Sequence, residues 1–453
     1  MKKLTLFAVI VLFVLSMLPM GVSAQGDVVG WSVDVQMTAE QTRFANRTKE
    51  ELVKRLAPSG AKAEVLNNRL ALKGANTPND LRDILFDQVS DWMDLTGGNA
   101  EIVLDVPANG QTLLVLQGMP ATGYSWVVED AGGADVSVGE SVQLSQAIGG
   151  PRGQSFAIAG NGGQVRLVYR RQWEAPQTAK TKMRLRLPAG LAKLELTDPT
   201  LDRQATRQLD APLGLDQLDL QAGETLVEAP AAYDSRADGI VPAIRDQGNC
   251  GSCWAFGTVG VMEVAVRIYT GTIYDLSEQF LVSCNKSGWS CKGGLTASMY
   301  HTSLLGRKQT QVGAVLEKDF RYAAKNLACT KKYAHPYKAN HWAFLTGSEW
   351  TMPSTDSIKD AIMTYGAVTA GVCVDDGWYT YTNGVYTSPY NDCGGSTNHQ
   401  IVLVGWDDAK GAWLLRNSWG TGWGDAGYMW IAYDPAGSTS RVGEGTSYIT
   451  MLP

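Results

Sequence analysis

Residues 247–256 read Gln-Gly-Asn-Cys-Gly-Ser-Cys-Trp-Ala-Phe, and this stretch decides what the C-terminal half of the chain is expected to be. A cysteine is a strong nucleophile only as a thiolate, which a nearby imidazole stabilises. Of the four histidines, His399 is the one that opens an apolar run typical of a buried strand. Further along, Asn417 offers a side-chain carbonyl that can accept from a ring N–H. The sequence therefore predicts Cys253 as nucleophile, His399 as base and Asn417 as the group that orients the ring.

This stretch resembles the active-site segment of papain and the cathepsins, which also follow the order cysteine, histidine, asparagine. The resemblance implies an α+β catalytic domain over residues 228–453, with a helical subdomain and a β-barrel-like subdomain. It implies that Gln247 and the backbone N–H of Cys253 stabilise the oxyanion, that no cofactor or metal is required, and that the substrates are proteins or peptides. The substrate-binding residues implied are Gly293, Gly294, Leu295, Thr296, Asn398 and Trp419.

These substrate-binding residues also predict which substrate side chain the binding pocket prefers. A glycine pair lets an extended substrate backbone approach, although a plain turn explains Gly293 and Gly294 equally well. No strongly charged side chain occurs among the expected pocket residues. An apolar residue is therefore expected in substrates at the second position before the scissile bond.

The seven cysteines leave at least one unpaired, or paired between chains. A structural disulfide is the usual alternative for a cysteine such as Cys253 in a secreted chain. The family resemblance instead implies a free Cys253. With Cys253 free, the disulfides that the resemblance implies for the other six cysteines join Cys250 with Cys291, Cys284 with Cys329, and Cys373 with Cys393.

The first residues are typical of a secretory signal peptide. Two lysines precede an apolar stretch that ends at the small-residue pattern Val22-Ser23-Ala24, so residues 1–24 are expected to be removed and the mature protein exported. An uncleaved membrane anchor is the alternative. The formal charge of −6 and the pI near 5.4 provide no basic surface for nucleic acid.

Two further units are expected before the catalytic domain. Residues 26–97 alternate strand-like and helix-like patterns, with helices over 39–56 and 77–92, and predict a small α+β domain. Residues 98–190 show short alternating strands with turn signals, which predict an all-β immunoglobulin-like sandwich. The chain is therefore expected to be multidomain.

Three loops of this sandwich resemble the binding loops of chagasin-type inhibitors of papain-like proteases. They are the first loop, residues 119–124, the second, 148–153, and the third, 170–174; Met119, Ala121 and Gln172 depart from the family pattern. A sandwich that serves only as a spacer, a folding aid or a binding unit is the alternative. The inhibitory residues implied are Pro120, Ala121, Thr122, Gly123, Gly149, Gly150, Arg171 and Trp173.

An acidic segment, residues 191–227, joins the sandwich to the catalytic domain and is typical of a protease-accessible linker. We expect a secreted cysteine endopeptidase made as a precursor, with its own inhibitor-like domain as partner in cis until the linker is cut. A transpeptidase or exopeptidase with the same nucleophile, and a binding module with an idle cysteine site, are the alternatives. Basic residues between 166 and 186 could pair with this linker, with the enzyme domain, or only with solvent.

Overall fold

The computed structural model describes residues 31–37, 62–66, 68–74, 99–139, 141–145, 147–179, 181–187, 193–197, 229–388, 396–433 and 440–451, together with single positions between them. The expected signal peptide, most of the helix over 77–92 and most of the acidic linker lie outside these residues. The single positions described between 39 and 56 are helical, in agreement with the helix predicted there. No described helix is long and apolar enough to cross a membrane.

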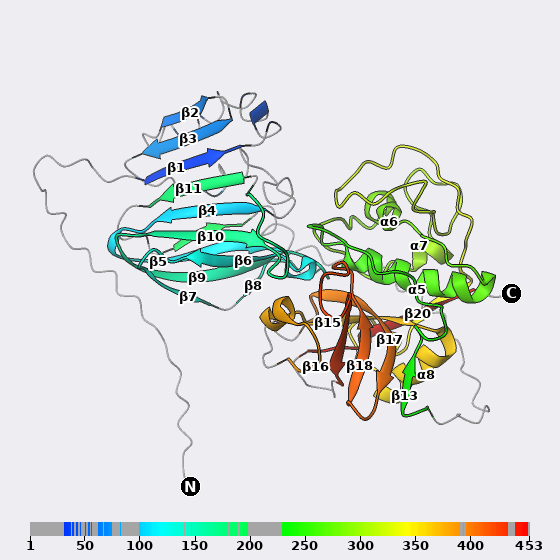
Figure 1. Cartoon of the computed structure of the whole chain (residues 1–453). Coiled ribbons are helices and arrows are strands. Elements are labelled where there is room, and N and C mark those ends of the chain that lie inside the picture. Colours follow the sequence, from blue (N-terminus) through cyan, green and yellow to red (C-terminus); the bar gives the residue numbers. More distant parts are fainter. Residues whose placement is uncertain are drawn as a thin grey trace, which may run out of the picture.

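The first part of the chain is built from two sheets (Figure 1). The larger has the strand order β2-β3-β1-β11-β4-β10-β6. Its strands are β1 (Trp31–Gln36), β2 (Lys62–Leu66), β3 (Arg69–Gly74), β4 (Ala100–Asp105), β6 (Ser125–Asp130), β10 (Gln164–Arg170) and β11 (Thr181–Arg186). The smaller has the order β12-β5-β9-β7, with β8 paired to β9. Its strands are β5 (Ala108–Gly118), β7 (Asp135–Val138), β8 (Val142–Gln143), β9 (Arg152–Asn161) and β12 (Lys193–Leu196).

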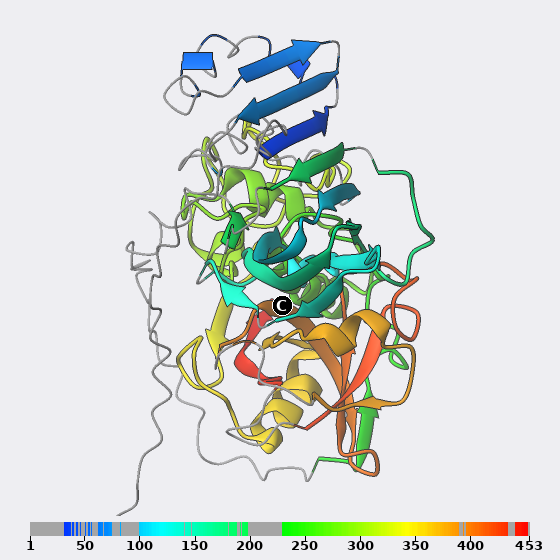
Figure 2. The same ribbon diagram turned by 90° about the vertical axis from the view of Figure 1, so that its left-hand side faces the viewer.

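The strands of the expected α+β domain belong to the same sheet as the expected sandwich. β1 pairs with β11 along its length, and β11 in turn pairs with β4 in parallel. Every second residue of β1 points inward, and Trp31, Val33 and Val35 join one hydrophobic cluster that continues to Leu196. The predicted boundary between residues 97 and 98 therefore separates neither two sheets nor two cores. In Figures 1 and 2, β1, β2 and β3 (blue) lie at the end of the sheet away from the second part of the chain.

The second part has helices on one side and a sheet on the other. The helices are α5 (Cys253–Thr270), α6 (Glu278–Cys284), α7 (Met299–Thr302) and, beside the sheet, α8 (Thr355–Tyr365). The sheet has the order β14-β20-β15-β17-β18-β19-β16, with β13 paired to β17. Its strands are β13 (Ala232–Asp234), β14 (His341–Phe344), β15 (Val368–Val372), β16 (Val385–Tyr386), β17 (His399–Asp407), β18 (Ala412–Arg416), β19 (Tyr428–Ala432) and β20 (Glu444–Thr450).

Two glycines bring α5 close to β17. A Cβ on Gly257 would lie 2.9 Å from the Cγ of Gln400, and one on Gly260 would lie 2.9 Å from a methyl carbon of Val402. Helix and strand thus run side by side in the same direction. The first residue of α5 and the first residue of β17 consequently lie at the same end of the contact, at the junction of the helical side and the sheet.

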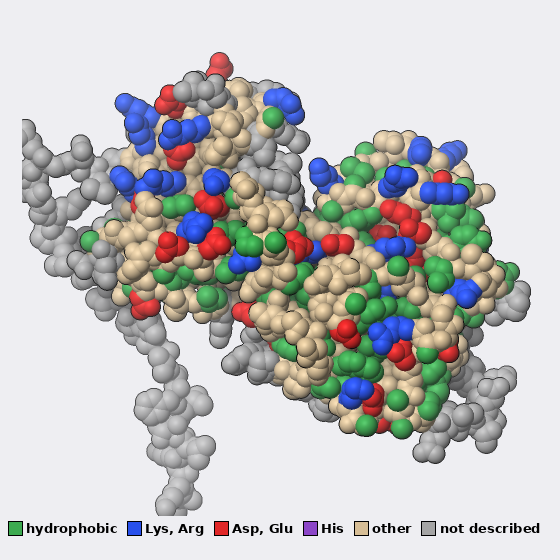
Figure 3. All heavy atoms as spheres, viewed as in Figure 1, with side chains coloured by type: hydrophobic (Ala, Val, Ile, Leu, Met, Phe, Trp, Pro, Cys, Tyr) green, Lys and Arg blue, Asp and Glu red, His purple; other side chains and the backbone are tan. Residues whose placement is uncertain are grey.

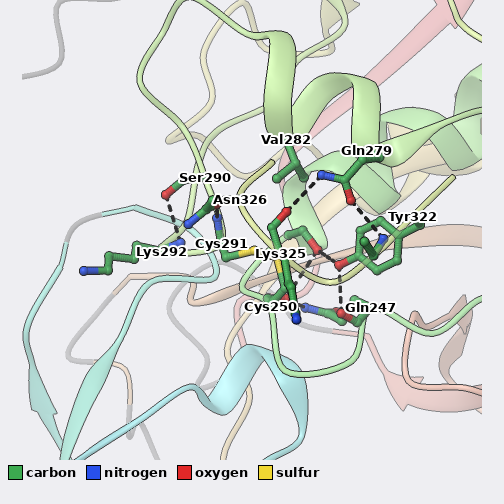
Figure 4. The surroundings of a disulfide bond; sticks show 12 residues. Gln247, Cys250, Gln279, Val282, Ser290, Cys291, Lys292, Tyr322, Lys325 and Asn326 are labelled. Carbon is green, nitrogen blue, oxygen red and sulfur yellow. Dashed lines mark hydrogen bonds between the residues drawn. A yellow bond between two sulfur atoms is a disulfide. The ribbon is translucent and has the colours of Figure 1, made fainter. Parts of the chain in front are cut away.

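All three expected disulfides are formed, between Cys250 and Cys291, Cys284 and Cys329, and Cys373 and Cys393, and Cys253 remains free. The first of them fixes the segment just before α5 (Figure 4). There the Tyr322 hydroxyl donates to the carbonyl oxygen of Gln247 at 2.7 Å. The loop that precedes the free cysteine is therefore held both covalently and by a partly buried hydrogen bond.

The basic residues between 166 and 186 mostly pair within the first part of the chain. On the face shown in Figure 3, lysine and arginine side chains alternate with acidic ones over the larger sheet. Arg184 pairs with Asp105, and Lys182 with Glu101. Arg171 differs, because its guanidinium reaches Asp246 in the second part of the chain.

Candidate active site

Cys253 is the first residue of α5, and its side chain is 0% exposed. The preceding Ser252 makes no side-chain cap, so the free N–H groups of the first turn are left to the surroundings of the sulfur. The positive end of a helix dipole favours a negative charge at this position. The helix start therefore suits a thiolate.

The hairpin of β17 and β18 brings His399 and Asn417 together. In this antiparallel pair Val402 lies opposite Arg416, so the first residues of β17 lie near the residues that follow β18. His399 Nε2 lies 2.8 Å from Asn417 Oδ1, which fixes the tautomer with its proton on Nε2, because an amide oxygen can only accept. The same oxygen accepts the N–H of Ser418 at 2.8 Å, which orients the amide.

Trp419 covers this pair. Its ring centroid lies 5.3 Å from that of His399, and its side chain is 1% exposed. A hydrogen bond shielded from water is electrostatically stronger. His399 Nδ1 is buried and has no hydrogen-bond partner in the part of the chain that the structure describes, so this nitrogen remains free to exchange a proton.

Gln247 is held at both ends of its amide. Its Oε1 accepts from the Ser418 hydroxyl at 2.7 Å, and its Nε2 donates to the carbonyl oxygen of Cys250 at 2.8 Å. An amide nitrogen carries two protons, so one donor remains. Gln247 lies five residues before the helix cap Ser252, and its bond to Cys250 keeps this donor close to the start of α5.

The second loop of the first part lies across this site. Ile148 and Gly294 form an antiparallel bridge with two hydrogen bonds of 3.0 Å, and the N–H of Gly149 donates to the carbonyl oxygen of Asn398 at 2.9 Å. A Cβ added to Gly149 would lie 2.8 Å from Cys253 Sγ. The loop backbone therefore occupies the space directly above the sulfur.

The first and third loops meet Trp419. Its indole N–H donates to the carbonyl oxygen of Ala121 at 2.8 Å, and its ring stacks on Trp173 with centroids 5.4 Å apart. Gly123 has φ +77°, and a Cβ there would lie 2.2 Å from Trp173, so the two loops are packed on each other as well. Of the other expected loop residues, Pro120 and Thr122 belong to the short helix η2 (Pro120–Thr122), and Gly150 forms a turn with Ala147.

An ion pair joins the two parts beside these loops. Arg171 donates to both oxygens of Asp246, at 2.9 and 2.8 Å, and also to the carbonyl oxygen of Thr122 at 3.0 Å. The arginine side chain is 1% exposed and that of Asp246 47%. Hydrogen bonding and charge from Arg171 hold the pKa of Asp246 below its usual value, although burial opposes this. A bidentate pair of this kind fixes orientation as well as adding energy.

Burial keeps Cys253 and His399 neutral in this arrangement. It raises the pKa of the Cys253 thiol to about 12, against backbone hydrogen bonds that lower it. It also lowers the pKa of His399 to about 4, although the hydrogen bond to Asn417 opposes the shift. At neutral pH the covered site therefore holds a thiol and an uncharged imidazole, which is the unreactive form.

The structure thus brings the four expected catalytic residues into one region. Gly293 and Gly294 flank the second loop, and Asn398 reaches it from the sheet side. Leu295 and Thr296 are buried beside them. Among the residues described, no group of three His, Cys, Asp or Glu side chains is placed to hold a metal ion.

Three further residues of this region were not predicted from the sequence. Asp246 directly precedes the motif, and its charge, opposite to that of Arg171, is the only signal that could have pointed to it. Ile148 is the first residue of the second loop, and no residue pattern marks it for contact with Gly294. Glu349 accepts the N–H of Thr296 at 3.0 Å, and burial raises its pKa to about 7; no motif marks it.

Comparison with known proteins agrees with this geometry. Residues 229–449 match the family model described as papain family cysteine protease. Cysteine proteinase COT44 of Brassica napus is 35% identical over 224 residues, which are 48% of this chain and 63% of that protein. Probable cysteine protease RDL6 of Arabidopsis thaliana is 35% identical over 223 residues, 48% of this chain and 59% of that protein. The chain therefore spans less than two thirds of the length of either plant relative.

Among solved structures, the digestive procathepsin L2 proteinase from the Tenebrio molitor larval midgut is 27% identical, with a TM-score of 0.44, over 50% of this chain and 70% of that one. The family match covers the free cysteine at the start of α5, the histidine and asparagine joined by the β17–β18 hairpin, and the glutamine fixed before them. Residues 229–449 therefore match the papain family of cysteine proteases.

Proposed function

We propose that the chain is an exported cysteine endopeptidase, made as a precursor whose chagasin-like residues 98–190 close the active site until they are removed. One observation carries this proposal. The second loop pairs with Gly294 and places Gly149 against Cys253 Sγ, where a peptide substrate must lie to be attacked. Removal of residues 1–24 at export and cutting within 191–227 are parts of the same proposal, and the three disulfides favour an oxidising compartment.

The chemistry of the uncovered site follows from its parts. Once water and substrate reach it, the helix dipole and the imidazolium form of His399 stabilise the Cys253 thiolate. The thiolate attacks the peptide carbonyl, and the backbone N–H of Cys253 and the remaining amide proton of Gln247 stabilise the oxyanion. His399 protonates the leaving amine, which gives an acyl-enzyme, and then activates the water that hydrolyses it, while Asn417 keeps the ring in place.

Closure in cis needs only modest affinity. Two surfaces on one chain meet at an effective concentration in the millimolar range, so loops that depart from the inhibitor pattern still hold the site shut. The contacts available are strand pairing at Gly294, stacking on Trp419 and the pair of Arg171 with Asp246. They lie on both sides of the sulfur, so the covered site admits no peptide.

The test compares two forms of one folded protein. A recognition sequence for a specific protease is inserted within residues 201–227, the folded chain is cut, and the C-terminal fragment is separated; this fragment is called the released peptidase. We expect the released peptidase to hydrolyse a peptide amide and to react at Cys253 with a thiol-directed epoxide at neutral pH. The uncut chain is expected to do neither. Equal activity of the two forms would leave the N-terminal residues with a role in folding or binding only.

The pH dependence of thiol labelling gives a second readout. In the uncut chain the pKa of Cys253 is about 12, so labelling by iodoacetamide should rise roughly tenfold per pH unit from pH 7 to 10. In the released peptidase the thiolate exists already at neutral pH, so the rate should be nearly flat over the same range. Mass spectrometry of the labelled peptide measures both. Parallel profiles for the two forms would contradict closure of the site by these loops.

Breaking the ion pair should loosen closure without touching the catalytic groups. In Asp246→Asn, Arg171 stays buried with only Glu174 and Thr122 as side-chain and backbone partners. Because Asp246 is 47% exposed, we expect a loss of about 1–3 kcal/mol, between the values for surface and buried pairs. Activity of the uncut chain should then rise roughly 5- to 150-fold. Asp105→Asn, which breaks pairs within the first part only, is the matched control and should leave the uncut chain inactive.

A further inference from the structure

We propose that residues 147–150 are a built-in mimic of the preferred substrate, so that the peptidase selects peptides with a β-branched aliphatic residue at the second position before the scissile bond. Ile148 stands for the second residue before that bond and Gly149 for the first. This inference rests on the proposed function and adds the substrate class to it.

The backbone contacts have the form of substrate binding by strand addition. Ile148 exchanges two hydrogen bonds of 3.0 Å with Gly294, and the next residue donates to Asn398 at 2.9 Å. These partners come from opposite sides of the site, Gly294 from the helical side and Asn398 from the residue before β17. Main-chain bonds of this kind give affinity for any extended peptide, while pockets for the side chains give specificity.

The position of the sulfur sets the register. Cys253 Sγ lies 2.8 Å from the place where a Cβ on Gly149 would be, so Gly149 is the loop residue held against the nucleophile. The chain reaches it from Ile148, which is therefore one residue further from the attacked bond. A peptide bound in the same register would present the carbonyl of its Gly149 equivalent for attack.

The surroundings of Ile148 indicate which side chain is accepted there. Ile148 is 3% exposed and joins the hydrophobic cluster that contains Leu295 and Ala297. A side chain this fully buried has to match its surroundings in size and in the absence of charge. In the loop's own conformation Gly149 has no room for a side chain, because the sulfur and the carbonyl oxygen of Gly251 would each lie 2.8 Å from a Cβ there.

The loop escapes cleavage because its backbone turns at the bond in question. Gly149 has φ +80°, and the N–H of Gly150 donates back to the carbonyl oxygen of Ala147 at 2.9 Å. The nitrogen that would have to leave is thus tied into a turn instead of following an extended path. A Cβ on Gly251 would lie 2.0 Å from the Gly149 carbonyl oxygen, which shows how tightly that oxygen is packed.

The experiment measures the same side-chain series twice. The released peptidase is assayed on peptide amides that carry Ile, Val, Ala or Lys at the second position before the bond and Gly at the first. In parallel, uncut chains with Ile148→Val, Ile148→Ala and Ile148→Lys are assayed for activity on one fixed peptide. We expect kcat/KM to fall roughly 10- to 200-fold from Ile to Ala and further to Lys, and activity of the uncut chains to rise in that order.

Several outcomes would overturn the inference. A preference for Lys in the peptides would mean that the Glu349 carboxylate, next to Thr296, governs the pocket instead. Peptide and loop series with different rank orders would show that Ile148 is held by the loop and does not report the pocket. The peptide series uses the unaltered enzyme, so it remains decisive if a loop variant folds poorly. Failure of the proposed function would give a different result from failure of this inference. In that case the uncut wild-type chain would be as active as the released peptidase.

Discussion

Cys253→Ala in the released peptidase is expected to abolish hydrolysis, with kcat/KM lowered by about 10⁴-fold or more. The reason is chemical, because no other described cysteine is free and the acyl-enzyme cannot form without a thiolate at the start of α5. Progress curves at high enzyme concentration measure the residual rate. The same substitution in the uncut chain should leave its fold and closure unchanged, since the sulfur makes no disulfide.

His399→Ala serves as a companion variant and His341→Ala as its control. The ring of His399 is hydrogen-bonded to Asn417, whereas His341 lies on β14 beside Tyr448, away from the site. Loss of activity in His399→Ala with retention in His341→Ala would assign the proton transfers to His399. Turnover by Cys253→Ala would show that the nucleophile is another group, and the catalytic proposal would fail.

The free Cys253 and the contact of His399 with Asn417 could be predicted from the sequence because the chemistry of a thiol nucleophile restricts the residue types and their order. A free thiol needs an imidazole and the imidazole needs an acceptor, which left few combinations among four histidines and seven cysteines. The presence of short strands in residues 98–190 also followed from alternating polarity, and β4 and β10 are two of them. Such local patterns depend on neighbours in sequence, and the sequence reports them directly.

Features that depend on long-range pairing could not be predicted in this way. The predicted domain boundary between residues 97 and 98 does not account for the pairing of β1 with β11. These two strands lie about 150 residues apart, and no local pattern in either one indicates the other. The contacts of Arg171 with Asp246 and of Ile148 with Gly294 depend on how the two parts dock. Polarity patterns fix which face of a strand is buried, but they do not fix what a loop at its end will touch.

Gly149→Ala is expected to open the site of the uncut chain and raise its activity at least 10- to 100-fold. Two effects add. The residue has φ +80°, which disfavours any L side chain by about 1 kcal/mol or more, and the new methyl group would lie 2.8 Å from both Cys253 Sγ and the Gly251 carbonyl oxygen. The second contact is with backbone and cannot be relieved by a side-chain rotation, so the loop must withdraw.

Gly133→Ala is the matched control for this change. Gly133 has φ +84°, so the backbone strain is equivalent, but a Cβ there would meet nothing within 4 Å. It lies in the same two-sheet part of the chain, between β6 and β7. Hydrolysis and epoxide labelling of Cys253 in the two uncut variants separate strain in the fold from obstruction at the sulfur. If Gly149→Ala stays as inactive as Gly133→Ala while the released peptidase is active, then the second loop is not what closes the site, and closure must depend on the contacts of Trp419 and Arg171 alone.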